Sequence, residues 1–240
     1  MKKRQKVRKG IILSTFFLFP AIFYYLSPVL IVQSSSQGII NGSFVIFTLL
    51  FLSSLSVGRA YCGWVCPGAG CQESMVMARD KKVQGGDHIK WVIWCPWIAL
   101  IIYHAVKAGG YKKIDFFYET IYGLSIGNVN ALVTYFIVLI VLIVLPAFII
   151  GKRSFCHHLC WMAPFMILGR KIRNIFQWAS LRLVADREAC IHCHTCSHNC
   201  PMSLPVEEMV SQSQMENAEC ILCGTCADGC SQSAILLRYK

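Results

Sequence analysis

Four long apolar runs occupy the first 150 residues of the chain. None contains an acidic residue, and each approaches the ~20 residues that an α-helix needs to cross the hydrocarbon core of a bilayer. A backbone in lipid must satisfy its own hydrogen bonds, so helices are the expected structure. The pattern predicts four transmembrane helices, kinked or ended by Pro20, Pro28, Pro96 and Pro146. The runs are roughly Ile11–Val32, Ile39–Val57, Trp91–Ala108 and Ala131–Ile150.

The second and fourth runs are followed by related motifs. Residues 58–67 read G-R-A-Y-C-G-W-V-C-P, and residues 151–161 read G-K-R-S-F-C-H-H-L-C-W. Each motif has a glycine, a basic residue, an aromatic residue and a C-x₃-C pair. The chain is therefore predicted to contain two tandem helical hairpins, each delivering a cysteine pair to the same membrane surface, as parallel repeats do in other membrane folds.

The basic residues predict the orientation. Lys and Arg gather in the amino-terminal head from Lys2 to Lys9, after the second run and after the fourth. The loop after the first run has none, and Lys112 and Lys113 after the third are offset by acidic neighbours. By the positive-inside rule, both termini lie in the cytosol of a multi-pass protein of the cytoplasmic membrane. The head and first run are interpreted as an uncleaved anchor rather than a signal peptide.

The composition is typical of a membrane protein, and a change in charge along the chain indicates a separate carboxyl-terminal domain. The chain is 55% hydrophobic and 15% charged, against about a quarter charged in soluble domains. The net charge is +11, and the Lys and Arg residues that produce it lie beside the apolar runs, as in a membrane anchor. Nucleic-acid binding is therefore excluded. Residues 183–240 carry seven acidic and three basic residues. This acidic tail is predicted to rest against the basic inner surface of residues 1–182.

The tail contains a repeated cysteine motif. The run C-x₂-C-x₂-C-x₃-C-P begins at Cys190, and C-x₂-C-x₂-C-x₃-C begins at Cys220. In bacterial two-cluster ferredoxins, the fourth cysteine of each run binds the other cluster. The spacing predicts a small α+β ferredoxin-like domain with two [4Fe–4S] clusters. Cluster 1 would use Cys190, Cys193, Cys196 and Cys230, and cluster 2 would use Cys220, Cys223, Cys226 and Cys200.

Structural zinc is the alternative for these eight cysteines. Zinc sites pair two C-x₂₋₄-C units, which leaves this repeated spacing without a purpose. Disulfides are not expected in the reducing cytosol. His192, His194 and His198 lie among the ligands, but a Rieske centre would replace two cysteines by histidines, and no cysteine is missing. These histidines are interpreted as loop residues that tune the cluster potential.

Cys62, Cys66, Cys156 and Cys160 form a separate candidate site. On a helix end, C-x₃-C places both sulfurs on one face, so the two pairs are expected to converge. Three interpretations are open: they ligate a metal or a third cluster, they act as redox-active thiols, or they are simply small buried residues. If they bind a metal, thiolate ligands would suit Cu(I) or an iron–sulfur cluster. Cys71 is a further candidate for this site, whereas Cys95 is interpreted as packing. The adjacent His157 and His158 face water or a quinone headgroup.

Together, G-R…C-G-W-V-C-P, the second C-x₃-C and the terminal double motif resemble the NapH/NosR/CcoG-type membrane polyferredoxins. The resemblance covers nearly the whole chain and is closest to the short NapH-like form. It implies that the C-x₃-C cysteines are functional. Trp161 departs from the proline that the family has after the second pair. The chain has no flavin-attachment or haem motif.

The resemblance implies a membrane-anchored electron-transfer subunit rather than a stand-alone enzyme. It would relay electrons between a quinone pool or a cytosolic donor and a partner redox enzyme, with membrane lipid and a ferredoxin-like donor or reductase as partners. The alternative is a CcoG-like cupric reductase or assembly factor, in which the C-x₃-C pairs bind copper.

Overall fold

A computed structural model describes residues 3–76, 78–83, 85–127 and 129–240. Lys2 of the predicted basic head lies outside them. Most of the described chain is helical. The helices are α1 (Lys3–Phe17), α2 (Phe19–Ile22), η1 (Phe23–Leu26, 3-10), α3 (Pro28–Ser36), α4 (Gly42–Val57), α5 (Ala60–Trp64), α6 (Pro67–Met75), α7 (Ile89–Lys107), α8 (Val129–Val138), η2 (Leu139–Val144, π), α9 (Leu145–Ile149), α10 (Ser154–His158), α11 (Ala163–Phe176), α12 (Thr195–His198), α13 (Val206–Ser211) and α14 (Thr225–Gly229).

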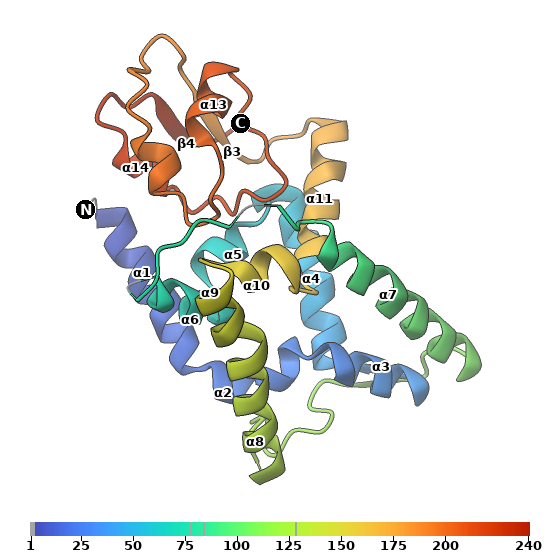
Figure 1. Cartoon of the computed structure of the whole chain (residues 1–240). Coiled ribbons are helices and arrows are strands. Elements are labelled where there is room, and N and C mark those ends of the chain that lie inside the picture. Colours follow the sequence, from blue (N-terminus) through green and yellow to red (C-terminus); the bar gives the residue numbers. More distant parts are fainter. Residues whose placement is uncertain (1–2, 77, 84, 128) are drawn as a thin grey trace.

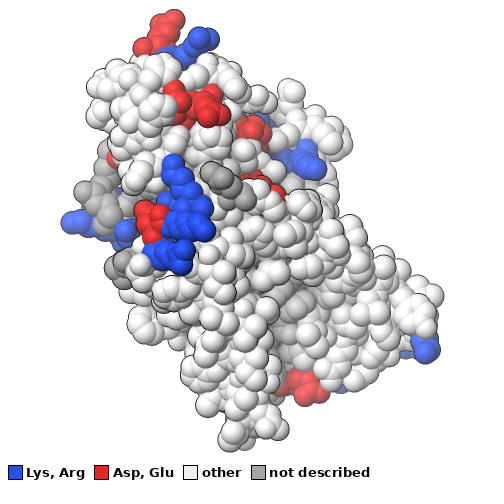
Figure 2. Space-filling model, viewed as in Figure 1, with Lys and Arg blue, Asp and Glu red and all other residues white. Residues whose placement is uncertain are grey.

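The long helices and the carboxyl-terminal module occupy opposite ends of the molecule. In Figure 1 the module lies at the top, and α7 and α8 extend downward from the short helices α5, α6, α9 and α10. Both marked termini lie at the module end. Charged side chains on the visible face gather around the junction, and the helices below carry few except near their far ends (Figure 2). We call residues 3–180 the anchor, after the role in the membrane that the sequence predicts for them.

Two helical segments are long and apolar enough to cross a membrane. They are Ile89–Lys107 and Val129–Ile149, which match the third and fourth predicted runs. A third candidate is the pair Lys3–Phe17 and Phe19–Leu26, which is bent by 62° at its break. The predicted second span corresponds to α4, a shorter apolar helix of 16 residues. Within the described residues, length and composition therefore give two candidate spans, or three if the bent pair counts as one.

The first predicted run is not one straight helix. It is divided among α1, α2, η1 and α3, with Pro20 near the start of α2 and Pro28 at the start of α3. Proline is tolerated in the first helical turn, where its missing N–H is not needed, so these prolines begin new helices. In contrast, α7 continues through Pro96. Pro146 lies just after the π segment η2. A π segment within a helix marks a place where the α-helical hydrogen-bond pattern is disturbed.

Two small sheets complete the fold. Strands β1 (Ile39–Asn41) and β2 (Lys113–Asp115) pair in parallel and join the start of α4 to the loop after α7. Strands β3 (Leu181–Ala185) and β4 (Ile235–Tyr239) pair antiparallel and tie the two ends of the module together. The module thus begins at β3, two residues before the predicted boundary at 183. It is the α+β element of a mainly helical chain.

Candidate functional site: cysteine clusters at the module and its junction

The structure brings the eight module cysteines together in the two groups that the crossover spacing predicts. Cys200, from the first run, lines one cavity with the first three cysteines of the second run. Cys230, from the second run, lines another cavity with the first three cysteines of the first run. The group that contains Cys200 is more enclosed, because all four of its cysteines are buried, whereas Cys193 of the other group is exposed. That each group binds a [4Fe–4S] cluster stays a prediction.

Repeated backbone turns build both cavities. His192 and His194 have φ values of 53° and 56°, and Leu222 and Gly224 repeat the same left-handed conformation at 49° and 72°. Alternation of left-handed and right-handed residues turns successive N–H groups inward, which creates a concavity for an anion such as an iron–sulfur cluster. Only glycine adopts this conformation without cost, so the strained residues mark a functional loop.

The histidines of the first loop bind a carboxylate. His192 Nδ1 is hydrogen-bonded to Glu207, and His194 Nδ1 lies 3.6 Å from the same carboxylate. Hydrogen bonding to His192 is the main cause that lowers the pKa of Glu207. Neither histidine stands in for a missing cysteine, in agreement with their interpretation as loop residues.

The two C-x₃-C motifs have the same local structure. Cys62 lies in α5 and Cys156 in α10, whereas Cys66 and Cys160 follow the ends of these helices. The amides of Cys66 and Cys160 donate to the carbonyl five residues earlier, at 3.0 and 2.9 Å. Each pair therefore brackets a helix end instead of lying on one continuous helical face, as the spacing alone suggested. This shared turn supports the predicted internal repeat.

All four of these cysteines are buried and lie near one another. Burial raises the pKa of Cys66, and the charges of Cys62, Cys156 and Cys160 raise it further. Burial and then Cys156 raise the pKa of Cys160 to about 12. The free thiols of Cys66 and Cys160 would therefore be neutral at pH 7, so a metal or cluster must displace their protons on binding. The sequence prediction that the two pairs converge agrees with this arrangement.

We call Cys62, Cys66, Cys156 and Cys160 the membrane-edge cysteines and their site the membrane-edge site, after the predicted topology. The other candidates near this site have different surroundings. Cys71 is buried but only burial raises its pKa, to about 11, and none of the four membrane-edge cysteines contributes. Cys95 is exposed on α7. His157 is buried and its Nδ1 lies 2.8 Å from Asp87, while His158 binds the Ser154 carbonyl. The expectation that His157 faces water is wrong, because this side chain is 4% exposed and lies beside the carboxylates of Asp87 and Glu219.

Buried cations surround the membrane-edge cysteines, and sequence reasoning missed their role. Arg59 precedes α5 and Arg153 precedes α10, and both have 0% exposure. Arg153 Nη1 donates to the Cys62 carbonyl at 3.0 Å. Burial raises the pKa of Cys62, whereas the charges of Arg59 and then Arg153 favour its thiolate. The basic residue ahead of each C-x₃-C was the available signal in the sequence.

Polar side chains near the four cysteines offer buried donor atoms for a bound anion. Arg59 Nε and Nη2, Arg153 Nε, Ser154 Oγ and His157 Nε2 are buried and have no hydrogen-bond partner among the described residues. An unsatisfied buried donor is costly, so such atoms indicate an acceptor that belongs at the site. The thiolates and sulfides of an iron–sulfur cluster are acceptors of this kind. The residues present therefore fit such a group.

The spacing of the cysteines argues against a single metal ion. A four-thiolate zinc site has Zn–S distances near ~2.3 Å, which brings its sulfurs within about 4 Å of one another. Among the described residues, the group whose ligand atoms lie within 4.8 Å of one another is Asp87, His157 and Glu219, and it contains no cysteine. Glu219 already pairs with two cations, Arg59 and Lys90. A cation would be repelled there.

Acidic module residues meet basic anchor residues, as the charge distribution predicts. Glu216 accepts hydrogen bonds from Arg170 and, at 2.9 Å, from Arg173. Arg4 Nε lies 2.9 Å from Asp228. The second cysteine loop also receives direct hydrogen bonds to its backbone from the anchor: Arg170 to the Cys220 carbonyl at 2.7 Å, Trp64 to Leu222 at 3.2 Å and Gln5 to Cys223 at 3.1 Å. The second cysteine loop, which would hold cluster 2, therefore faces the anchor.

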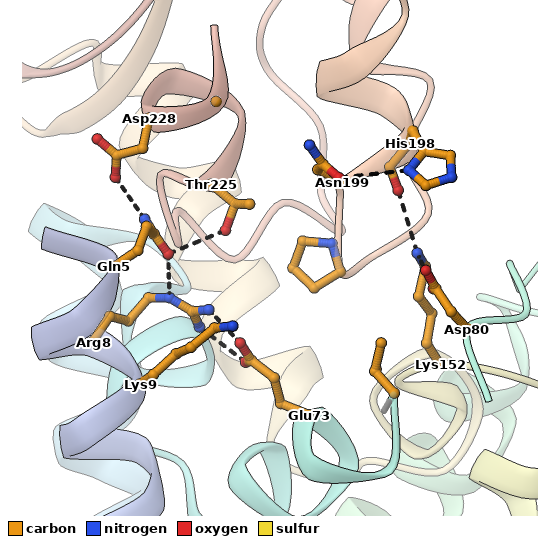
Figure 3. Close-up of a pocket in the computed structure, with 13 residues that line it drawn as sticks. Gln5, Arg8, Lys9, Glu73, Asp80, Lys152, His198, Asn199, Thr225 and Asp228 are labelled. Atoms are coloured by element: carbon orange, nitrogen blue, oxygen red, sulfur yellow. Dashed lines mark hydrogen bonds and ion pairs between the residues drawn. The ribbon is translucent and has the colours of Figure 1, made fainter. Parts of the chain in front are cut away.

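A cavity of about 400 Å³ opens beside this junction. Figure 3 shows Arg8 and Lys9 of α1 facing Glu73 of α6, with Thr225 and Asp228 of the module above them. Although burial alone would raise the pKa of Glu73, the charges of Arg153 and Arg8 lower it to about 2. Glu73 is therefore ionised at neutral pH and links α1 to the second repeat.

Family comparisons agree with both cysteine regions. Residues 189–235 match the family described as 4Fe-4S dicluster domain. Residues 42–83 and 132–178 both match the family described as 4Fe-4S binding domain. Two separate matches to one family support the internal repeat, and they assign iron–sulfur chemistry to the regions that hold the C-x₃-C pairs.

Two curated relatives are each 25% identical to the chain. An uncharacterized protein of Methanocaldococcus jannaschii aligns over 76% of this chain and 74% of its own length. The methylamine utilization ferredoxin-type protein MauN of Methylorubrum extorquens aligns over 72% of this chain and 59% of its own length. No solved structure matches. These similarities and the site geometry support an iron–sulfur protein of the polyferredoxin type, with ferredoxin-type 4Fe–4S domains.

Proposed function

We propose that this chain is a membrane-anchored electron-transfer subunit with two [4Fe–4S] clusters in its cytosolic module and a third at Cys62, Cys66, Cys156 and Cys160. It would relay electrons between a quinone pool or a soluble donor and a partner redox enzyme. The observation that carries the proposal is the pair of module cavities, each lined by four cysteines drawn from both motifs. The clusters supply one-electron redox chemistry, and the chain supplies ligands, position and charge.

The contact between module and anchor supports electron transfer between them. The loop that carries Cys220 and Cys223 packs on Gly63, which lies between the membrane-edge Cys62 and Cys66. A Cβ atom at Gly63 would lie 3.3 Å from the Cys223 Cβ atom. Burial lowers the pKa of the Arg153 guanidinium, but Glu73 and then Cys156 and Cys223 raise it, so Arg153 lies close to cysteines of both sites. The second module site and the membrane-edge site are therefore neighbours.

The outer face of the module suits a soluble redox partner. Cys193 is exposed, and the adjacent Ile191 is 61% exposed. The anchor donates at least three hydrogen bonds to the backbone of the second cysteine loop, but to the first run it donates only that from Lys152 to the His198 carbonyl, at 3.4 Å, among the described contacts. We expect a ferredoxin-like donor or a reductase to approach cluster 1 here. A ferredoxin-type relative in methylamine utilization is consistent with an accessory role in a larger redox system.

Four membrane crossings with both termini in the cytosol fit the arrangement of the chain. The two segments long enough to span are α7 and α8–η2–α9. In this topology α4 and the bent α1–η1 segment provide the other two crossings. Arg4 near the amino terminus pairs with Asp228 of the carboxyl-terminal module, which supports a topology with both ends on one side of the bilayer. Lipid would cover the apolar faces of these helices.

A copper site is the competing use of the C-x₃-C pairs, and the geometry does not favour it. Cu(I) binding by thiolates needs the sulfurs around one ion. Among the described residues, no group of three cysteines has all its sulfurs within 4.8 Å of one another. Four irons in a cubane, in contrast, separate the four thiolates that hold them.

The test uses the full chain, purified without oxygen and reconstituted in liposomes that contain a quinone analogue. A reduced soluble ferredoxin and a lipid-soluble quinol are offered separately, and cluster reduction is followed by visible absorbance and EPR. We expect at least one donor to reduce the clusters, and Cys156→Ser to interrupt exchange with the bilayer while both module clusters remain. No response to either donor would contradict the proposal. Reduction of Cu(II) that depends on Cys62 and Cys66 would favour the copper alternative.

A further inference from the structure

One carboxylate at the membrane edge is shared by two buried arginines. The carboxylate of Glu73 in α6 accepts hydrogen bonds from Arg8 Nη1 at 2.9 Å and from Arg153 Nη2 at 2.6 Å. Arg8 is 2% exposed and Arg153 is 0% exposed. Arg153 comes from the second repeat and also donates to the Cys62 carbonyl of the first. This triad, with two cations and one anion, lies directly beside the membrane-edge cysteines.

A second triad repeats this pattern on the side that faces the module. The carboxylate of Glu219 accepts hydrogen bonds from Arg59 Nη1 at 2.9 Å and from Lys90 Nζ at 2.6 Å. Both cations have 0% exposure. Arg59 is the first-repeat counterpart of Arg153, because each precedes the short helix that carries the first cysteine of its pair. The internal repeat therefore supplies one guanidinium to each triad.

The two triads leave positive charge in excess. Four cations less two carboxylates give a surplus of two positive charges. Asp87 also lies near Lys90, but it is half exposed and pairs with His157, so water screens it. Burying unpaired cations is strongly unfavourable. An oxidised cubane with a core charge of 2+ and four thiolates carries a charge of 2−, which balances the surplus.

Among the described residues, the surplus at the module sites is smaller: two cations and one carboxylate, Arg170, Arg173 and Glu216, lie beside the Cys220 site, which leaves one positive charge. The residues that line the cavity of Cys190, Cys193, Cys196 and Cys230 include Glu207 and no Lys or Arg. The residues that line the cavity of Cys220 and its partners include no charged side chain. Arg170 approaches this second cavity through the Cys220 carbonyl, and it shares Glu216 with Arg173. Positive charge thus increases from cluster 1 to cluster 2 to the membrane edge.

Reduction of a cluster adds one negative charge, and this charge is stabilised most where the surplus of positive charge lies. Burial opposes reduction, because it disfavours an increase in cluster charge. However, the Cys220 group is also buried, so burial does not distinguish it from the membrane-edge site. Coulomb interactions are strong at short distance in a medium of low effective dielectric constant, and the triads lie within the protein rather than in screening solvent. The charges therefore decide the order of the two sites.

We infer that Arg59 and Arg153 make the membrane-edge site the highest-potential centre of the chain, so that electrons run from the module toward the membrane. This inference rests on the proposed cluster at that site. In the step from module to membrane edge, the second module centre loses one electron and the membrane-edge centre gains it, and no proton or bond is transferred. Arg59 and Arg153 act as positioning residues, since they act through charge and hold no iron.

The test is an EPR-monitored redox titration of the full chain in detergent without oxygen. Cys156→Ser identifies the signal of the membrane-edge centre. We expect this signal to appear at the highest potential. Arg153→Gln should lower its potential, Glu73→Gln should raise it, and Arg153→Lys should keep it nearly unchanged. The control Lys113→Gln removes an exposed cation from the far end and should have no effect.

Opposite shifts from Arg153→Gln and Glu73→Gln separate an electrostatic role from structural damage, which would not change sign with the charge. A membrane-edge signal at a lower potential than the module signals would overturn the inference while the proposed function stands. Shifts of the same sign in both variants would also overturn it. Absence of any signal that Cys156→Ser removes, with about eight irons per chain instead of about twelve, would overturn both the third cluster and this inference.

Discussion

Gly63 of the anchor lies against the backbone of Ile221 in the second cysteine loop. A Cβ atom on Gly63 would overlap the Ile221 carbonyl oxygen and would lie 3.2 Å from the Cys223 Cα atom. Both opposing atoms are backbone atoms, so no flexible side chain can move aside. The absence of a side chain at one position thus allows the membrane-edge motif and the module to touch.

Gly63→Ala should weaken docking of the module by on the order of 2 kcal/mol, because the second loop must shift to accept a methyl group. Hydrogen–deuterium exchange of the amides near Cys220 and Cys223 should become faster. Gly10→Ala is the matched control, since nothing lies within 4 Å of its added Cβ atom in α1. Equal exchange in both variants would contradict a tight contact at Gly63.

Cys200 tests the crossover of the two motifs. It belongs by sequence to the first run, but it shares a cavity with Cys220 and its neighbours. Cys200→Ser should therefore disturb the cluster of the second run and leave an EPR spectrum of cluster 1. Cys95→Ser, which changes an exposed cysteine of α7, should leave both spectra unchanged. Selective loss of cluster 1 in Cys200→Ser would show that the ligands do not cross over.

Docking of the module should resist salt. Arg59 and Lys90 are fully buried where they meet Glu219, and buried pairs are screened far less than exposed ones. Raising the salt concentration from about 0.1 M to about 1 M should leave amide exchange in the junction within about twofold of its starting rate. A large salt-induced increase would mean that solvent reaches these pairs.

Breaking one of these pairs should have a much larger effect than salt. Glu219→Gln keeps the shape of the side chain and leaves Arg59 and Lys90 without their anion. Loss of one partner of a buried pair typically costs about 3–5 kcal/mol. We expect thermal unfolding at a clearly lower temperature, with Glu208→Gln, an exposed glutamate of α13, as control. Similar unfolding temperatures for the two variants would contradict a buried, anchoring Glu219.

The fold was predictable where a short pattern determines it. The third and fourth apolar runs match α7 and α8–η2–α9, because an unbroken apolar helix is a strong local signal. The cysteine spacing correctly anticipated which four cysteines share each module cavity. The prediction of a single helix for the first run was wrong, because hydrophobicity alone does not show that Pro20 and Pro28 begin new helices.

The charged contacts of the site could not be predicted in the same way. Arg59 and Glu219 are 160 residues apart in sequence, and Arg8 and Glu73 are 65 apart. No periodicity connects such pairs. The total charges of anchor and tail indicated that the two parts attract each other, but only the folded chain shows that each carboxylate is shared by two buried cations.

Mössbauer spectroscopy of ⁵⁷Fe-labelled full chain, purified without oxygen, tests the central claim most directly. The account predicts about twelve irons per chain, all with the parameters of [4Fe–4S] clusters, and about four fewer in Cys156→Ser. A colourless protein that binds zinc in place of iron, or one whose iron is not in cubane clusters, would contradict it.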